Sequence, residues 1–98
     1  MAPHLDRWDS ELRDRGLRVI EVEYGPATAL PSLEQHLRRK PVAYTVLHDA
    51  DGSVTARFGA QAFPTAFLVD RLGKVVWHGF PIRDVAGIDA AIRAEVAK

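Results

Sequence analysis

Residues 57–76 have the sequence RFGAQAFPTAFLVDRLGKVV, in which apolar runs alternate with turn-forming residues. Segment 65–69 is a run of apolar and β-branched residues, as expected for a strand. The sequence DRLG at residues 70–73 has the composition of a turn and leads into a second apolar run at 74–79. Two strands joined by a short glycine-containing loop predict a β-hairpin.

The sequence on either side of this hairpin predicts helices and two more strands. Leu5, Trp8 and Leu12 recur at helical spacing, which predicts a helix over residues 4–15. The other expected elements are a strand at 17–24, a helix capped by Ser32 and ended by Pro41, a strand at 42–47, one or two helical turns at 53–58 and a helix at 84–96. This order predicts an α/β fold in which a mixed sheet is flanked by helices.

The length and charge of the chain exclude several classes of function. Ninety-eight residues suit one domain, which we assign to residues 1–98. Thirteen lysines and arginines balance thirteen acidic residues, so no overall field attracts nucleic acid or an anionic membrane. No apolar stretch reaches the roughly 18 residues that a membrane span needs, and residues 1–7 do not have the pattern of a signal peptide. The sequence does not indicate a compartment.

The absence of cysteine is the most restrictive feature of the composition. It excludes disulfides, thiolate nucleophiles, thiolate metal sites and dithiol redox chemistry within this chain. The glycines do not have the spacing of a phosphate-binding loop, so we expect no nucleotide or other cofactor.

Segment 57–76 resembles the pattern Y/F-G-V-x-x-x-P-T-x-F-L-I-D-x-x-G-K-I-V of the TlpA/ResA-type bacterial thiol-disulfide oxidoreductases, which belong to the thioredoxin-like superfamily. The sequence DADG at residues 49–52 resembles the D-x-D-G turn of the same family, and GLRVI at residues 16–20 resembles the start of one of its strands. The resemblance covers nearly the whole chain. It implies a thioredoxin-like fold.

The resemblance also implies a binding loop. In this family a cis-proline loop faces the redox dithiol, and the backbone just before the proline pairs with an extended substrate peptide. The matching residues here are Ala62, Phe63, Pro64 and Thr65. A cis bond before Pro64 is physically reasonable, because the cis form of an X–Pro bond costs only about 0.5–1 kcal/mol. The alternative is a simple turn that buries an aromatic side chain.

The sequence departs from the family at its start. In the family a strand ending in W-C-x-x-C precedes the first helix, and residues 1–5 resemble the part of that helix just after the second cysteine. The absent strand would be central, between residues 17–24 and 65–69. Without this strand, the two flanking strands have unpaired backbone N–H and C=O groups, and each such group lowers the folding stability by about 1–3 kcal/mol if it is buried. Three remedies are open: the flanking strands pair directly, a partner chain supplies or exchanges an element, or the native polypeptide extends upstream of Met1. We favour the last.

Other polar residues give weaker indications of function. Glu21 shares a strand face with Val19, where an unpaired carboxylate would have a raised pKa. We expect Glu21 to reach solvent through the gap left by the absent strand. We place Asp9, Glu11 and Asp14 on a solvated helix face, and Trp8 and Trp77 in the core. The histidines lie on separate predicted elements, which argues against a metal site; they are His4, His36, His48 and His78.

Two hypotheses of different classes follow. The first is a thioredoxin-fold domain of the thiol-disulfide oxidoreductase family, which acts on protein or peptide substrates in the family but is redox-inactive as given. The second is a cysteine-free interaction module that binds an extended segment at residues 62–65 or at an exposed strand edge. A homodimer formed by exchange of a strand or another element is a variant of the second hypothesis. Neither hypothesis assigns a catalytic residue to this chain.

Overall fold

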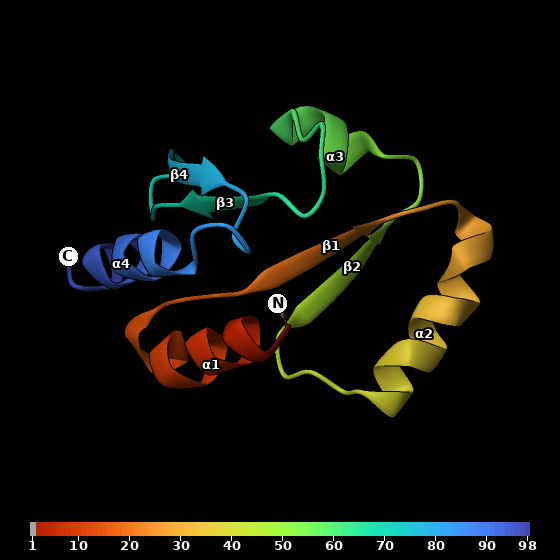
Figure 1. The fold of residues 1–98 in the computed structure, drawn as a ribbon, viewed down its shortest axis with the longest axis horizontal. Helices are drawn as coiled ribbons and strands as arrows, with labels where there is room; N and C mark the ends of the chain where they lie inside the picture. Colours follow the sequence, from red (N-terminus) through yellow and green to blue (C-terminus); the bar gives the residue numbers. More distant parts are fainter. Residues whose placement is uncertain (1) are drawn as a thin grey trace. The chain divides into compact units, whose positions relative to one another are not determined.

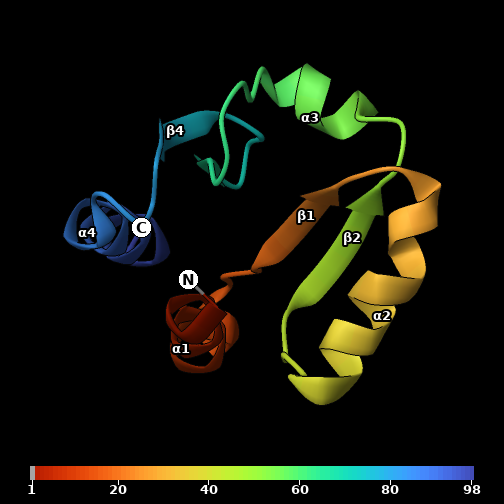
Figure 2. The same cartoon turned by 45° about the vertical axis from the view of Figure 1, so that its right-hand side comes forward.

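A computed structural model describes residues 2–98 and divides them into two compact units, Ala2–Ala60 and Gln61–Lys98. Figure 1 and Figure 2 show the order of the elements, which agrees with the predicted order of helices and strands. Each unit is described by itself below. No helix among these residues has both the length and the apolar character needed to cross a membrane.

The N-terminal unit begins with α1 (Ala2–Leu12), which continues as a 3-10 turn, η1 (Arg13–Arg15). Trp8 and Leu12 are the buried apolar residues of the helix, as their spacing predicts. Asp9 was expected on the solvated face, and that expectation is wrong: Asp9 is only 2% exposed. Its neighbour along the helix is Arg13, whose Nε lies 3.6 Å from Asp9 Oδ2. The helix therefore buries a wider stripe than its apolar residues define.

Two parallel strands form the sheet of this unit, β1 (Ile20–Tyr24) and β2 (Thr45–Asp49). Their register pairs Ile20 with Thr45 and Tyr24 with Asp49. Parallel neighbours need a crossover, and η2 (Ala27–Ala29) with α2 (Leu30–Arg39) provides it. The crossover helix begins before Ser32, which therefore does not cap it, and β2 begins later than the expected strand at 42–47.

The turn after β2 is built by Asp49 and leads into α3 (Ser53–Phe58). Asp49 Oδ2 accepts hydrogen bonds from the backbone N–H and the hydroxyl of Thr55, at 2.9 and 2.8 Å. Gly52 has φ of +72°, a left-handed conformation that glycine adopts without strain, and the ring of Tyr24 lies against it. The DADG sequence thus ends β2 and starts α3.

The C-terminal unit contains the expected hairpin and the last helix. Strands β3 (Ala66–Val69) and β4 (Val75–Gly79) pair in antiparallel fashion, with Phe67 opposite His78. Asp70 Oδ1 accepts from the backbone N–H groups of Leu72 and Lys74 and so holds the turn. The unit ends with α4 (Val85–Val96), whose residues Ile88 and Ile92 are buried.

Both sheets are two-stranded, with orders β1-β2 and β3-β4. Within residues 2–98, each of these strands therefore has a hydrogen-bonded neighbour at one edge. The outer face of β1 is also apolar and exposed, with Ile20 at 57% and Tyr24 at 57%. Parallel sheets are normally covered on both faces. Among residues 2–98, β1 has neither a second hydrogen-bonded strand nor a cover over its apolar outer face.

Candidate functional site

The loop at residues 62–65 lies in the C-terminal unit and leads directly into β3. The peptide bond between Phe63 and Pro64 is cis. Thr65 closes the loop, because its hydroxyl donates a hydrogen bond to the carbonyl of Ala62. The side chain of Thr65 is half-buried, while Ala62, Phe63 and Pro64 are exposed.

The exposure of Phe63 bears on the alternative reading of this loop as a simple turn. A turn built only to bury an aromatic side chain would hide Phe63, yet it is 64% exposed. The strand that follows, β3, uses one edge for β4. No other strand of residues 2–98 pairs with β3, so its second edge has no hydrogen-bonded strand in the described part of the chain.

A second polar cluster, in the N-terminal unit, surrounds Glu21. The residue was expected to reach solvent, but it is half-buried, and the hydroxyl of Tyr44 donates a 3.0 Å hydrogen bond to its Oε1. Tyr44 itself is 5% exposed. Burial, followed by the hydrogen bond to Glu21, raises the pKa of Tyr44 well above its usual range. The phenol is therefore a permanent donor to Glu21 across physiological pH.

Glu23 is the third member of this cluster and was not singled out from the sequence. It is half-buried on the same face of β1 as Glu21. Hydrogen bonding with the Glu21 side chain, then burial and the charge of Glu21, raises the pKa of Glu23 to about 7. The alternation Glu21-Val22-Glu23 in a strand was a signal for two carboxylates on one face.

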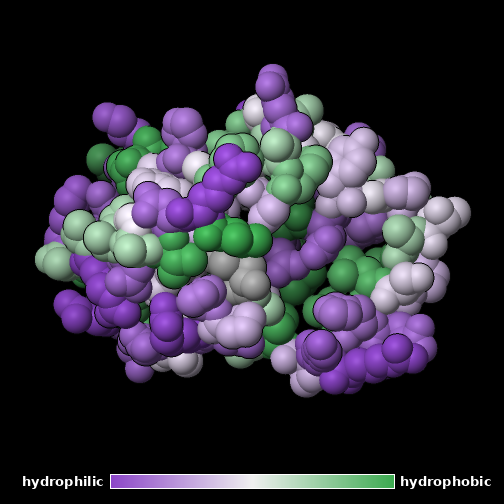
Figure 3. Space-filling model, viewed as in Figure 1, coloured by the Kyte–Doolittle hydropathy of each residue, from purple (hydrophilic) through white to green (hydrophobic). Residues whose placement is uncertain are grey.

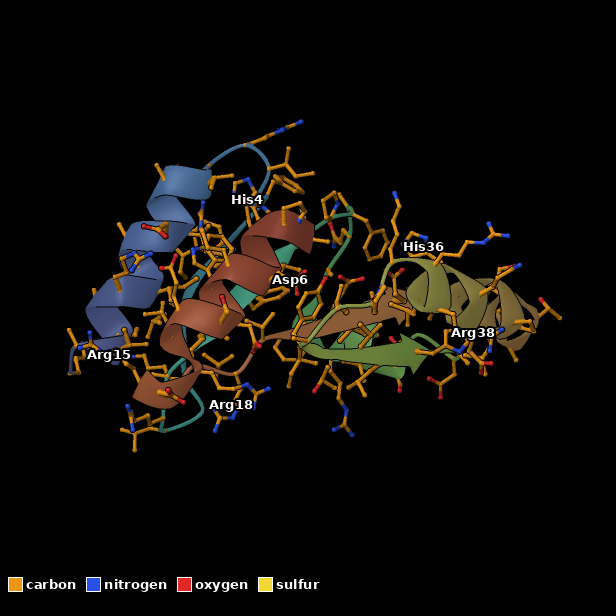
Figure 4. All side chains as sticks on the ribbon, turned by 90° about the horizontal axis from the view of Figure 1, so that it is seen from below. His4, Asp6, Arg15, Arg18, His36 and Arg38 are labelled. Atoms are coloured by element: carbon orange, nitrogen blue, oxygen red, sulfur yellow. The ribbon has the colours of Figure 1, made fainter. Side chains whose placement is uncertain are left out.

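The histidines lie apart and have separate environments. His4 stands 6.0 Å from the ring of Trp8, and His48 Nε2 lies 2.9 Å from the carbonyl oxygen of Gly25. His78 stacks on Phe67 at 6.3 Å, and His36 is exposed on α2. Figure 4 shows His4 and His36 on different helices, α1 and α2. No group of three or more histidine or acidic side chains in residues 2–98 is placed to hold a metal ion.

A shallow pocket of about 230 Å³ lies in the N-terminal unit. The residues that line it are Leu37, Pro41, Val42, Tyr44 and Val46. Apolar side chains, drawn green, are visible between α2 and β2 in Figure 3. The pocket contains none of the loop residues 62–65.

Comparison with known proteins assigns the family. A sequence profile of the AhpC/TSA family matches residues 1–78. The chain belongs to the AhpC/TSA family. This assignment confirms the resemblance to the thioredoxin-like superfamily, and it places the cysteine-free chain among relatives of thiol-disulfide oxidoreductases.

Solved structures support the fold. A Chlorobium tepidum protein described as a thiol:disulfide interchange protein, DsbE, superposes with a TM-score of 0.85 at 26% identity, over 97% of this chain and 67% of that one. A Neisseria meningitidis protein described as a thioredoxin superposes with a TM-score of 0.75 at 26% identity, over 98% of this chain and 66% of that one. None of the curated proteins compared with the sequence matches it. The AhpC/TSA chain spans about two thirds of the length of these two structures, and the α/β fold with small sheets flanked by helices is confirmed.

Proposed function

We propose that residues 1–98 form the substrate-binding part of a thiol-disulfide oxidoreductase of the TlpA/ResA type, within one thioredoxin-like domain. The relatives described as a thiol:disulfide interchange protein and a thioredoxin support the reaction class. Because the chain has no cysteine, the thiols for such a reaction must come from outside these residues.

In this proposal Ala62, Phe63, Pro64 and Thr65 hold the substrate. The observation that carries it is the exposed Phe63 ring in a loop that leads into β3, a strand whose second edge pairs with no strand of residues 2–98. An extended peptide segment can pair with the backbone at this edge, while the aromatic ring contacts its side chains. The hydrogen bond from Thr65 to the carbonyl of Ala62 keeps the loop in one shape for that purpose.

The test is peptide binding to isotope-labelled protein followed by amide NMR. The probe is an eight-residue peptide with alternating apolar and polar residues and one S-methylated cysteine. We expect shifts concentrated at residues 62–69, and binding weakened by about tenfold or more in Phe63→Ala. Ile82→Ala is the matched control, since Ile82 is 61% exposed in the same unit but lies outside the loop. Shifts spread over the whole chain, or equal loss in both variants, would contradict the proposal.

A second candidate is the non-catalytic interaction module, which binds an extended partner in the same loop without redox chemistry. The absence of cysteine favours it. Its homodimeric variant is favoured by β1, whose apolar face is exposed and whose pairing is one-sided. Size-exclusion chromatography with light scattering, read beside a thermal melt, separates the cases. A cooperative monomer supports the interaction module without exchange, whereas a stable dimer supports exchange of a strand or another element.

A further inference from the structure

The C-terminal end of α2 carries basic side chains that have no acidic partner. His36, Arg38, Arg39 and Lys40 are all exposed. Within residues 2–98 none of them forms an ion pair, and Glu34, one helical turn before Arg38, is not bonded to it. The helix dipole favours cations at this end of a helix. Their charged groups nevertheless remain in solvent, where they can bind an anion.

The pocket of about 230 Å³ lies beside two of these cations. Leu37 lines the pocket from α2, and successive residues of an α-helix are about 100° apart, so Arg38 flanks Leu37 and Arg39 lies nearly opposite to it. Figure 4 shows Arg38 on this helix. Lys40 directly precedes Pro41, a second lining residue. We call Arg38 and Lys40 the basic rim of the pocket.

Hydrogen bonds inside the N-terminal unit fix one wall of the pocket. Tyr44 is 5% exposed, and its hydroxyl donates to Glu21 Oε1 at 3.0 Å. The backbone N–H of the preceding residue, Ala43, donates to Asp6 Oδ1 of α1 at 3.4 Å. A site whose walls are held before binding loses less conformational freedom when a ligand arrives, which favours affinity.

The two ends of the pocket differ in charge. The basic rim lies at the α2 end, whereas the carboxylates of Asp6 and Glu21 are bonded to the segment that contains Tyr44. A carboxylate of a ligand is therefore attracted to the rim and repelled from the Tyr44 end. Four of the five lining residues have hydrocarbon side chains, so the part of the ligand that enters the pocket is apolar.

The volume of the pocket and the number of cations select the class of ligand. Pockets for small molecules and cofactors usually have about 300–1,000 Å³, so a volume of about 230 Å³ suits a single large side chain better. Thirteen basic residues balance thirteen acidic ones over the chain, which gives no overall field for nucleic acid. Segments that bind anionic lipid usually have about 4–8 lysines and arginines, and residues 38–40 provide three. An acidic protein segment fits these features best.

We propose that the pocket and its basic rim bind an acidic segment of a partner protein, which places one leucine-sized side chain in the pocket and pairs flanking carboxylates with Arg38 and Lys40. In such contacts the buried anchor supplies most of the affinity, and the charges at the rim set the orientation and the association rate. The site consists of residues within 37–46 and shares none with loop 62–65. It is therefore a second binding surface, beyond the peptide loop of the proposed function.

Amide NMR on the isotope-labelled full chain tests the proposal. The probe is a seven-residue peptide with a central leucine between two pairs of aspartates and a glycine at each end. We expect saturable shifts concentrated at residues 36–46. A peptide with glycine in place of the leucine should bind about tenfold more weakly or worse, because the anchor is lost. A peptide with lysines in place of the aspartates should not bind, because the rim repels it.

Variants of the chain test the role of the rim. A double variant with Arg38→Gln and Lys40→Gln should bind the acidic peptide about tenfold more weakly. Arg39→Gln removes the same charge from the same helix on the side away from Leu37, and it is the matched control, expected to change the affinity by less than about twofold. All three sites are exposed, and the amide spectrum of each variant confirms its fold. Phe63→Ala should bind this peptide as wild type does, so the outcome is independent of the test of loop 62–65.

Several outcomes would overturn the proposal. They are equal losses in the double variant and in Arg39→Gln, unchanged affinity for the glycine peptide, shifts confined to residues 62–69, and no binding at peptide concentrations up to about 2 mM. Sedimentation with vesicles of phosphatidylcholine and phosphatidylglycerol, at a ratio of about 3:1, provides a further test. Vesicle binding that depends on the rim, without binding of the peptide, would assign these cations to a lipid surface and would also overturn the proposal.

Discussion

Asp49 holds Thr55 at two points: its Oδ2 accepts from the backbone N–H at 2.9 Å and from the hydroxyl at 2.8 Å. Asp49 Oδ1 also accepts from the backbone N–H of Val54, at 3.3 Å. One carboxylate at the end of β2 thereby satisfies free N–H groups in the first turn of α3. These bonds, led by the backbone N–H of Thr55, hold the pKa of Asp49 below its usual value.

Replacing this carboxylate should destabilise α3 and the end of β2. Asp49→Ala removes three hydrogen bonds, and we expect the melting temperature to fall by roughly 5–10 °C, in the range of a lost helix cap in a small domain. Since the folded pKa is lowered, the stabilisation is present above about pH 3.8 and is lost as pH falls. Thermal melts at pH 7 and pH 3 measure both effects. Asp14→Ala, at an exposed site, should change neither.

Trp8 should be the most sensitive core position of the N-terminal unit. Its side chain is 1% exposed, and Trp→Ala at such sites costs about 3–5 kcal/mol. Small domains are stable by only about 5–15 kcal/mol, so Trp8→Ala should bring the chain close to unfolding. Urea denaturation measures the change. Leu72→Ala is the comparison, because Leu72 is 93% exposed, and a similar loss there would contradict the assignment of the core.

Two glycines with nearly equal φ provide a matched pair. Gly52 and Gly59 have φ of +72° and +70°, so alanine is strained at both positions. A Cβ at Gly52 would overlap the ring of Tyr24, whereas a Cβ at Gly59 meets no atom of the described chain within 4 Å. We expect Gly59→Ala to cost about 1 kcal/mol and Gly52→Ala clearly more. Tyr24→Ala should recover part of the difference, and equal costs would show that the ring does not lie against Gly52.

The chain alone should show no thiol chemistry. Residues 1–98 contain no cysteine, so we expect no catalysed reduction of insulin disulfides and an identical melting curve with and without dithiothreitol. Reductase activity in a preparation of the purified chain would contradict the assignment of the thiols to another segment. This experiment is independent of peptide binding at residues 62–65, so each result can be interpreted by itself.

The sequence predicted local structure well and contacts between distant segments poorly. The β3–β4 hairpin was predictable because an apolar run, a DRLG turn and a second apolar run lie within 15 residues. The start of β2 was misplaced because Val42 suits a strand by composition, although pairing with β1 begins only at Thr45. The residue preferences of residues 42–47 alone cannot predict the register in which β2 pairs with β1.

The cluster of Glu21, Glu23 and Tyr44 also depends on a contact between distant segments that the sequence does not predict. The placement of Glu21 on the face of Val19 followed from alternation, but its partner Tyr44 lies 23 residues away and is brought close only by the parallel register. Buried Asp9 was missed for a related reason, because a polar residue beside an apolar helical stripe is indistinguishable in sequence from one on the solvent side. The family pattern, by contrast, predicted a binding loop at residues 62–65 without any geometry, and that role stays a prediction.

The exposed row of Ile20, Val22 and Tyr24 on β1 also affects how the protein behaves at high concentration. Within residues 2–98, one edge of β1 has no hydrogen-bonded strand, and a short strand with an apolar face and an unpaired edge is a template for cross-β stacking of identical chains. In such a stack Glu21 and Glu23 would lie above their own copies, and charged carboxylates there act as gatekeepers against fibril growth. Acidification neutralises carboxylates, so at low pH this protection against cross-β stacking is lost once a fraction of the chain unfolds.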